Sequence, residues 1–145
     1  MQRIGPALSF FGRSIFADRS PRHAEISAKV YVRVRFGELS QASLAQVDTG
    51  AAWSVLAPDV AAAANISVAS GDPTRLSTRF GIKEGHLVRA PLTFEADEGD
   101  PLVTEATFFV VQDWPQGMTF LGYSGLLDSM RFALDPQANH FYFGS

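Results

Sequence analysis

Residues 46–56 read QVDTGAAWSVL and form the most informative segment of the chain. Asp48 follows one apolar strand, and a Thr and a Gly separate it from a second apolar run that ends at Leu56. An aspartate that caps an ordinary turn would explain the Asp and the Gly. Such turns lie on polar surfaces, whereas a carboxylate between two buried strands is costly unless it is paired or used chemically. The pattern therefore favours a functional role for Asp48.

Strand signals surround this loop. Residues 28–36 alternate apolar and polar side chains with a period of two, which predicts a half-buried strand. Residues 42–47 return after a Gly-Glu turn, so the two segments are expected to form a hairpin. Many short strands with few helices indicate a mostly β barrel or sandwich. Further strands are predicted at 53–56, 74–80, 86–96, 103–111, 119–122, 131–135 and 141–143, with short helices at 58–65 and 124–130.

Composition excludes several classes of protein. The chain has 145 residues, 46% hydrophobic and 19% charged, which fits a single domain with a core of its own. It has no cysteine, so disulfides, thiol nucleophiles and cysteine-zinc sites are ruled out, and its net charge of -3 argues against nucleic-acid binding. No apolar run approaches the roughly 18 residues of a membrane span. The histidines (His23, His86 and His140) lack metal-ligand spacing. We therefore expect a cytoplasmic protein with no metal and no cofactor.

The N-terminal segment differs in charge from the remainder. Residues 1–35 carry seven basic and two acidic side chains, whereas the remaining 110 carry five basic and thirteen acidic ones. We divide the chain into a basic tail or leader, residues 1–27, and a domain, residues 28–145. The leader is interpreted as a solvated tail, with a docking arm or a cleaved propeptide as the alternatives.

The loop at Asp48 resembles the active-site loop of the retropepsin-like aspartic proteases. Residues 48–51 match the family's Asp-Thr-Gly-Ala, and Ser54 falls where the family has Ser or Thr. A second landmark, two apolar residues before a glycine and then a short helix, is matched by residues 120–122 and 124–130. The resemblance spans residues 28–143. It implies the acid-protease half-domain, a closed β-barrel with one or two short helices.

The sequence departs from that family in two places. Retropepsins usually have Asp at the position of Ala52 and Arg at that of Tyr123, and those two side chains pair. Losing both is physically coherent, because losing only one would leave an unpaired charge. The expected flap, residues 80–85, is also less rich in glycine than that of the viral enzymes, so cellular and bacterial relatives resemble this chain more closely.

The resemblance implies an aspartic endopeptidase. Pepsin-type catalysis uses two carboxylates that share one proton around a water molecule, yet this chain has one Asp-Thr-Gly. We therefore expect a homodimer, in which Asp48 meets its symmetry mate on a two-fold axis. Asp48 would activate the water, Thr49 would brace the two loops across the axis, and Gly50 would let the substrate backbone come close.

A peptide or protein substrate would bind extended between the flap and the cleft floor. The expected substrate-binding residues share positions in the flap or subsites and a small or apolar character, and they are Ala51, Val55, Gly81, Ile82, Gly85, Met118 and Phe120. Met118 and Phe120 could instead be core residues, and Trp114 could rim the cleft or anchor its loop. The alternative function is a peptide-binding or dimerisation module with the same fold and no catalysis.

Overall fold

The computed structural model describes residues 2–4, 8–15, 17–19, 26–115 and 117–145. Strands dominate it, as the sequence predicts, with one α-helix and one 3-10 helix. No helix in these residues is long and apolar enough to cross a membrane. The elements are β1 (Gln2–Ile4), β2 (Leu8–Phe10), β3 (Gly12–Ile15), β4 (Ala17–Arg19), β5 (Ile26–Phe36), β6 (Ser43–Val47), β7 (Ser54–Leu56), α1 (Pro58–Ala63), β8 (Asp72–Thr78), β9 (Gly81–Phe94), β10 (Glu98–Gly99), β11 (Leu102–Val111), β12 (Phe120–Leu121), the 3-10 helix η1 (Leu127–Ser129), β13 (Arg131–Asp135) and β14 (His140–Gly144).

The long strand β5 forms as its alternation predicts. Val32, Val34 and Phe36 are fully buried, whereas Arg33 between them is exposed. This burial places one face of β5 against the core, where Phe36 meets the ring of Phe108 edge-on at 5.8 Å. Because the side-chain period of a strand is two, a shift of one residue would turn the whole apolar set outward, so the register is strongly specified.

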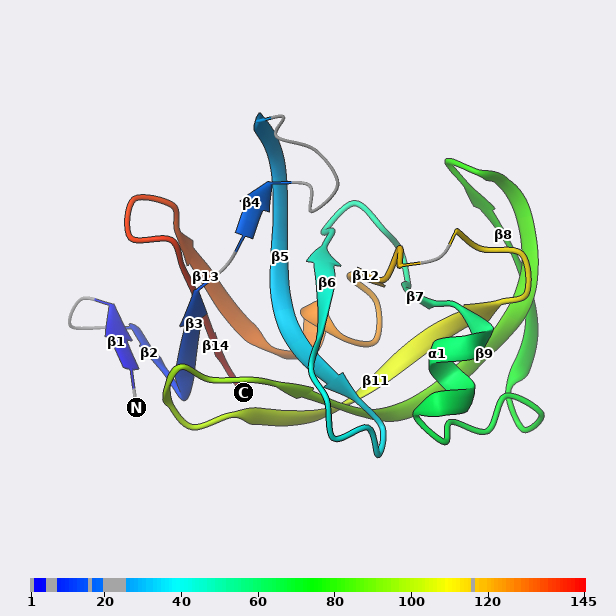
Figure 1. Ribbon diagram of the computed structural model, residues 1–145, viewed down its shortest axis with the longest axis horizontal. Coiled ribbons are helices and arrows are strands. Elements are labelled where there is room, and N and C mark those ends of the chain that lie inside the picture. The colour runs from blue at the N-terminus through cyan, green and yellow to red at the C-terminus, as the bar shows by residue number, and fades with distance from the viewer. Residues whose placement is uncertain (1, 5–7, 16, 20–25, 116) are drawn as a thin grey trace.

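The larger sheet is strongly curved (Figure 1). Its eight strands follow the order β4-β5-β6-β12-β7-β11-β9-β8, and β5 pairs additionally with β9. The pairing therefore returns from β9 to β5, while β4 and β8 lie outside this ring of strands. The helix α1 packs near β11.

A short strand at the centre of this sheet positions the loop after β6. The strand β12 pairs in parallel with β6 and antiparallel with β7, and β7 pairs in parallel with β11. The chain thus leaves β6 at Val47, forms a loop over residues 48–53, and re-enters the sheet on the other side of β12. This crossing fixes both ends of the loop that carries Asp48.

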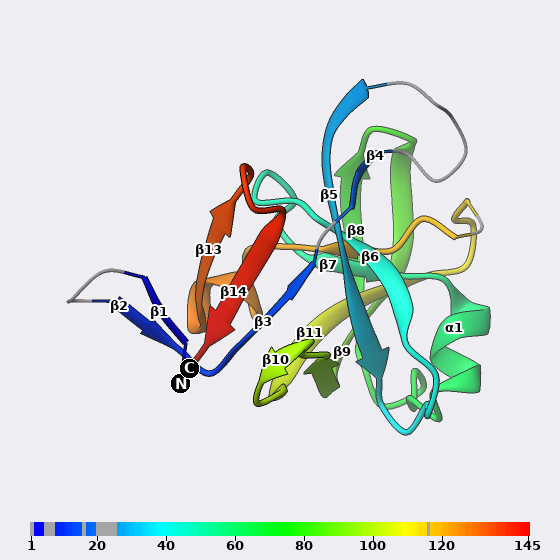
Figure 2. The same cartoon turned by 60° about the vertical axis from the view of Figure 1, so that its left-hand side comes forward.

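The smaller sheet has the order β10-β3-β14-β13 and stands beside the larger one (Figure 1, Figure 2). Its strand β3 comes from the segment that the sequence analysis assigns to the N-terminal leader, and it pairs antiparallel with β14. Phe141 and Phe143 of β14 are fully buried and lie within 6.1 Å of the ring of Phe94 from β9. The aromatic C-terminal strand therefore joins the two sheets through the core.

Two local expectations need adjustment. The hairpin predicted from residues 74–80 and 86–96 is present as β8 and β9, but the second strand begins earlier, at Gly81. Its turn is therefore at residues 79–80, and Gly85 lies within β9 rather than at the tip. The helix expected at 124–130 is only the 3-10 turn η1, because Gly125 has a φ of +74° and interrupts helical geometry.

Candidate active site

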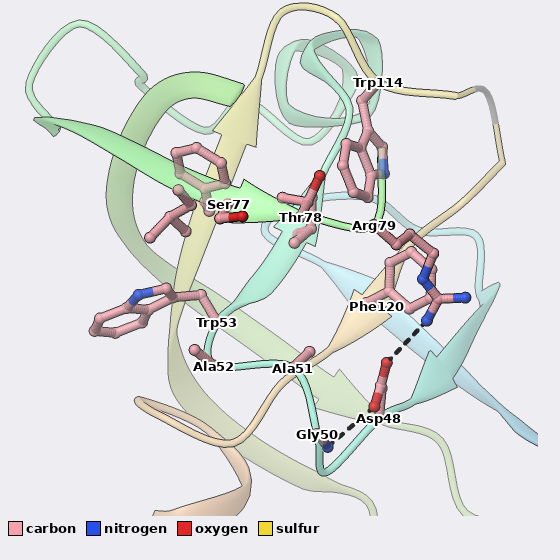
Figure 3. Close-up of a pocket in the computed structure, with 13 residues that line it drawn as sticks. Asp48, Gly50, Ala51, Ala52, Trp53, Ser77, Thr78, Arg79, Trp114 and Phe120 are labelled. Carbon is pink, nitrogen blue, oxygen red and sulfur yellow. Dashed lines mark hydrogen bonds and ion pairs between the residues drawn. The ribbon is translucent and has the colours of Figure 1, made fainter. Parts of the chain in front are cut away.

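The Asp48 side chain lines a pocket of about 430 Å³, which lies between the loop of Asp48 and the β8–β9 hairpin (Figure 3). Most of the side chains that line the pocket are apolar, and they are accompanied by two hydroxyl side chains from β8 and by two charged side chains, Asp48 and Arg79. An apolar hollow with a few polar groups is the usual form of a binding site. Its lining residues are Asp48, Gly50, Ala51, Ala52, Trp53, Val55, Leu76, Ser77, Thr78, Arg79, Phe109, Trp114 and Phe120.

The Asp48 side chain is held by its own loop and is 23% exposed. Its Oδ1 accepts a hydrogen bond of 3.0 Å from the backbone N–H of Gly50. Its backbone N–H donates to the carbonyl of Leu121 at 2.9 Å, and its carbonyl accepts from the N–H of Ala51 at 3.1 Å. These bonds form a tight turn that fixes the carboxylate at the end of β6 and leaves Oδ2 directed toward the pocket (Figure 3).

Ser54 connects the loop of Asp48 to the segment that contains Gly122. It is fully buried, and its Oγ accepts a hydrogen bond of 2.9 Å from the N–H of Gly122. Gly122 is required there because a Cβ atom on it would lie 2.3 Å from the carbonyl carbon of Trp53. The two landmarks that the sequence analysis singled out, residues 48–54 and 120–122, are therefore in direct contact.

Backbone hydrogen bonds join the two segments at which the sequence departs from the retropepsin pattern. The N–H of Tyr123 donates to the carbonyl of Ala51, and the N–H of Ser124 donates to that of Ala52, both at 2.8 Å. Ala52 and Tyr123 have exposed side chains. The association of these two segments therefore rests on main-chain bonds, which do not depend on a charged pair of side chains.

Arg79 is a pocket residue that the sequence did not predict. It lies in the β8–β9 turn, and its Nη2 approaches Oδ2 of Asp48 at 3.4 Å. Its guanidinium carbon also lies 5.2 Å from the centroid of the Phe120 ring. No local pattern marks this arginine, because the contact joins residues 31 positions apart and depends on how the hairpin folds over the loop.

Aromatic side chains form the wall beside Arg79. The indole of Trp114 meets the ring of Phe80 edge-on at 5.2 Å and that of Phe120 at 6.0 Å. Its Nε1–H donates to the carbonyl of Met118 at 2.5 Å. Trp114 therefore lines the pocket and anchors its loop, which combines the two roles that the sequence left open.

The structure brings together only some of the expected site residues. Asp48, Gly50, Ala51, Val55 and Phe120 line the pocket, while Thr49 is exposed next to it. The remaining four residues do not line it. Gly81 starts β9 at a φ of +97°, Ile82 is 63% exposed, Gly85 is pressed against β11, and Met118 packs beneath the pocket in a cluster with Val55 and Phe120.

A second ion pair fastens the hairpin to the loop beyond β11. Nζ of Lys83 donates to Oδ2 of Asp113 at 2.8 Å. This hydrogen bond, together with the positive charge of Lys83, lowers the pKa of Asp113 below its ordinary value. Lys83 is thereby committed to Asp113, so Arg79 is the cation that faces the pocket. In the described part of the chain, no three His, Asp or Glu side chains cluster to hold a metal ion.

Comparisons with known proteins give results for structure alone. No protein-family model matches the chain, and no curated protein sequence matches it. A retropepsin-like aspartic protease from Rickettsia conorii is similar over 92% of this chain and 91% of its own, with a TM-score of 0.56 and 18% identity. The retroviral protease-like domain of Ddi1 from Leishmania major is similar over 81% of this chain and 94% of its own, with a TM-score of 0.51 and 18% identity. The chain therefore has the retropepsin-like fold.

Proposed function

We propose that the protein is an aspartic endopeptidase that acts as a homodimer. The observation that carries this proposal is the placement of Asp48: its turn is braced by Ser54 and Gly122, and its carboxylate opens into an apolar pocket under a hairpin. A carboxylate fixed in this way is oriented before any substrate arrives, which is what acid-base chemistry requires.

The second carboxylate would come from another copy of the chain. The Asp-Thr-Gly sequence occurs once, and Thr49 and Gly50 are exposed beside Asp48. A two-fold axis next to this loop would bring Asp48 to its symmetry mate without any further residue. Two carboxylates about 3 Å apart cannot both be ionised, so the pair would hold one proton. Thr49 would then brace the two loops across the axis.

The reaction follows from the two protonation states. The ionised Asp48 accepts a proton from the water molecule while the water oxygen attacks the peptide carbonyl carbon. The protonated Asp48 of the other copy donates its proton to the carbonyl oxygen, which gives a neutral tetrahedral intermediate. As the C–N bond breaks, a proton passes from the intermediate's hydroxyl to a carboxylate, and one carboxyl protonates the leaving nitrogen.

The pocket favours an apolar side chain beside the cleaved bond. Val55 and Phe120 form its floor, and Trp114 forms one wall. An extended peptide would lie between this floor and the β8–β9 hairpin, with Ala51, Gly81 and Ile82 beside its backbone. We assign no substrate contact to Gly85, because its close packing against β11 accounts for the glycine.

The alternative function is a peptide-binding module of the same fold. One observation favours it: Asp48 already has a partner in Arg79, which gives the carboxylate a structural role without catalysis. In that case the pocket would hold an extended segment of another protein, and no bond would be cut.

Cleavage of a mixed peptide library at pH values from about 4 to 7 tests the proposal. Wild type, Asp48→Asn and the exposed control Asp59→Asn on α1 would be compared at equal concentration. We expect wild type and the control to cut beside apolar residues, and Asp48→Asn to cut nothing. Cleavage by Asp48→Asn would refute the proposal. Folded but inactive wild-type protein that still binds peptides would establish the alternative.

A further inference from the structure

We propose that Arg79 determines substrate specificity by selecting peptides that carry a carboxylate side chain close to the apolar residue in the pocket. This inference rests on the proposed protease function and goes beyond it, because it names a second chemical feature of the substrate. The fold alone does not supply it, since it depends on one side chain at the turn of the β8–β9 hairpin.

Arg79 competes with the catalytic water molecule for one carboxylate oxygen of Asp48. Oδ1 of Asp48 is held by the N–H of Gly50 at 3.0 Å, whereas Oδ2 faces the pocket and has the guanidinium 3.4 Å away (Figure 3). A water molecule that bridges two Asp48 carboxylates needs the oxygen that faces the pocket. The guanidinium must therefore give up part of its contact with Oδ2 when the water and the peptide bind.

Counting charges in the dimer leads to the same conclusion. Two Asp48 carboxylates with one shared proton carry one negative charge, but two copies of the chain contribute two Arg79 side chains. At least one guanidinium therefore has no carboxylate of its own in the reactive state. Of the residues that the structure describes, Asp48 is the only acidic one lining the pocket, and the hydroxyls of Ser77 and Thr78 carry no charge.

A bound peptide would raise the free-energy cost of leaving that guanidinium without a carboxylate. The Arg79 side chain is 53% exposed, so water now solvates the half that does not face Asp48 and Phe120. A peptide between the hairpin and the floor would displace this water, and a charge covered without a partner is strongly unfavourable. An aspartate or glutamate of the substrate would restore the pairing, and a planar guanidinium is well suited to bind a carboxylate through two hydrogen bonds.

The hairpin is fastened so that Arg79 stays in the pocket. Phe80, the next residue, packs edge-on against Trp114 at 5.2 Å, and Lys83 is tied to Asp113 at 2.8 Å. Both contacts join the hairpin to adjacent residues of the loop after β11 and restrain the turn that carries Arg79. The selection therefore acts through a positioned cation, in the way that a site built for a polar partner rejects substrates without one.

Matched peptides test the inference. Each pair would share one apolar cleavage site and differ only by Glu or Gln at one of the positions within about four residues of the cut. For wild type we expect kcat/KM to favour Glu by about 10- to 100-fold at one position, around the lower end of the loss for a buried charge without its partner, because Arg79 is only partly covered. Arg79→Gln should cut both peptides equally. Arg75→Gln, which removes an exposed arginine of β8 that lies outside this pocket, should keep the wild-type preference.

Binding to the Asp48→Asn variant separates this inference from the proposed function. Tryptophan fluorescence reports occupancy there without cleavage, because Trp53 and Trp114 line the pocket. We expect the Glu peptide to bind at least tenfold more tightly than the Gln peptide, and the difference to vanish in the Asp48→Asn, Arg79→Gln double variant. Equal binding of the two peptides, or a preference that survives Arg79→Gln, overturns the role of Arg79 even if wild type is a protease. Absence of cleavage by wild type with a retained Glu preference overturns the protease function alone.

Discussion

Replacing Ser54 by alanine tests how the turn that carries Asp48 is held. Ser54 is fully buried, and its Oγ accepts the hydrogen bond from the N–H of Gly122 at 2.9 Å. Alanine removes the acceptor and is too small to displace the backbone, so the Gly122 N–H would be left buried without a partner. Such a group costs about 1–3 kcal/mol in the free energy of unfolding. For a chain of this length each kcal/mol lowers Tm by about 2–4 °C.

The assay is thermal and urea unfolding followed by circular dichroism. Protein concentration would be kept fixed, because a dimer's stability depends on it. Ser77→Ala is the matched control, since it deletes the same hydroxyl from an exposed position of β8 and should change stability by less than about 0.5 kcal/mol. If Ser54→Ala were no less stable than Ser77→Ala, the hydrogen bond to Gly122 would not be what joins the two loops.

Two further predictions concern the same region. Gly122→Ala should lower the free energy of unfolding by about 1–3 kcal/mol, because the new Cβ would lie 2.3 Å from the backbone of Trp53. Gly50→Ala should lower the free energy of unfolding by less in the same assay, because a Cβ at position 50 would lie 3.3 Å from its nearest neighbour, Oδ1 of Asp48. Equal losses of stability in the two variants would contradict the packing argument. The hydrogen bond and charge of Lys83 lower the pKa of Asp113 in the folded state, so their stabilisation is present above the ordinary value of 3.8 and is lost as pH falls below it. The difference in Tm between wild type and Asp113→Asn should therefore close on acidification, and a gap that widens below that pH would contradict this reading.

The strands and the turn at Asp48 could be predicted because their signals are local. The alternation of β5 places Val32, Val34 and Phe36 on one face, and the structure buries all three. The motif at Asp48 and the apolar pair before Gly122 were recognisable as a pattern in the sequence, although the reason for the glycine, its approach to the backbone of Trp53, is not local. The mostly β fold and its retropepsin-like form were therefore predictable from the sequence and are confirmed.

The features that sequence reasoning missed arise from contacts between distant segments. Gly85 is interpreted as a flap residue because glycines suggest a turn, but the strand β11 approaches it so closely that a Cβ would lie 2.2 Å from the carbonyl oxygen of Val110. Arg79 reaches Asp48 only because the hairpin folds over the loop. Residues 12–15 find their partner in β14, more than a hundred positions later. Neither periodicity nor motif spacing contains this information.

A mixing experiment decides whether Asp48 acts together with its copy from a second chain. Increasing amounts of Asp48→Asn protein would be added to a fixed amount of wild type under conditions in which subunits exchange, and the cleavage rate would be measured. If each site needs two Asp48 carboxylates, mixed dimers are inactive, and an equal amount of variant should reduce the rate to about half. A rate that stays unchanged or rises, with subunit exchange verified, would show that one Asp48 is sufficient and would contradict the shared site.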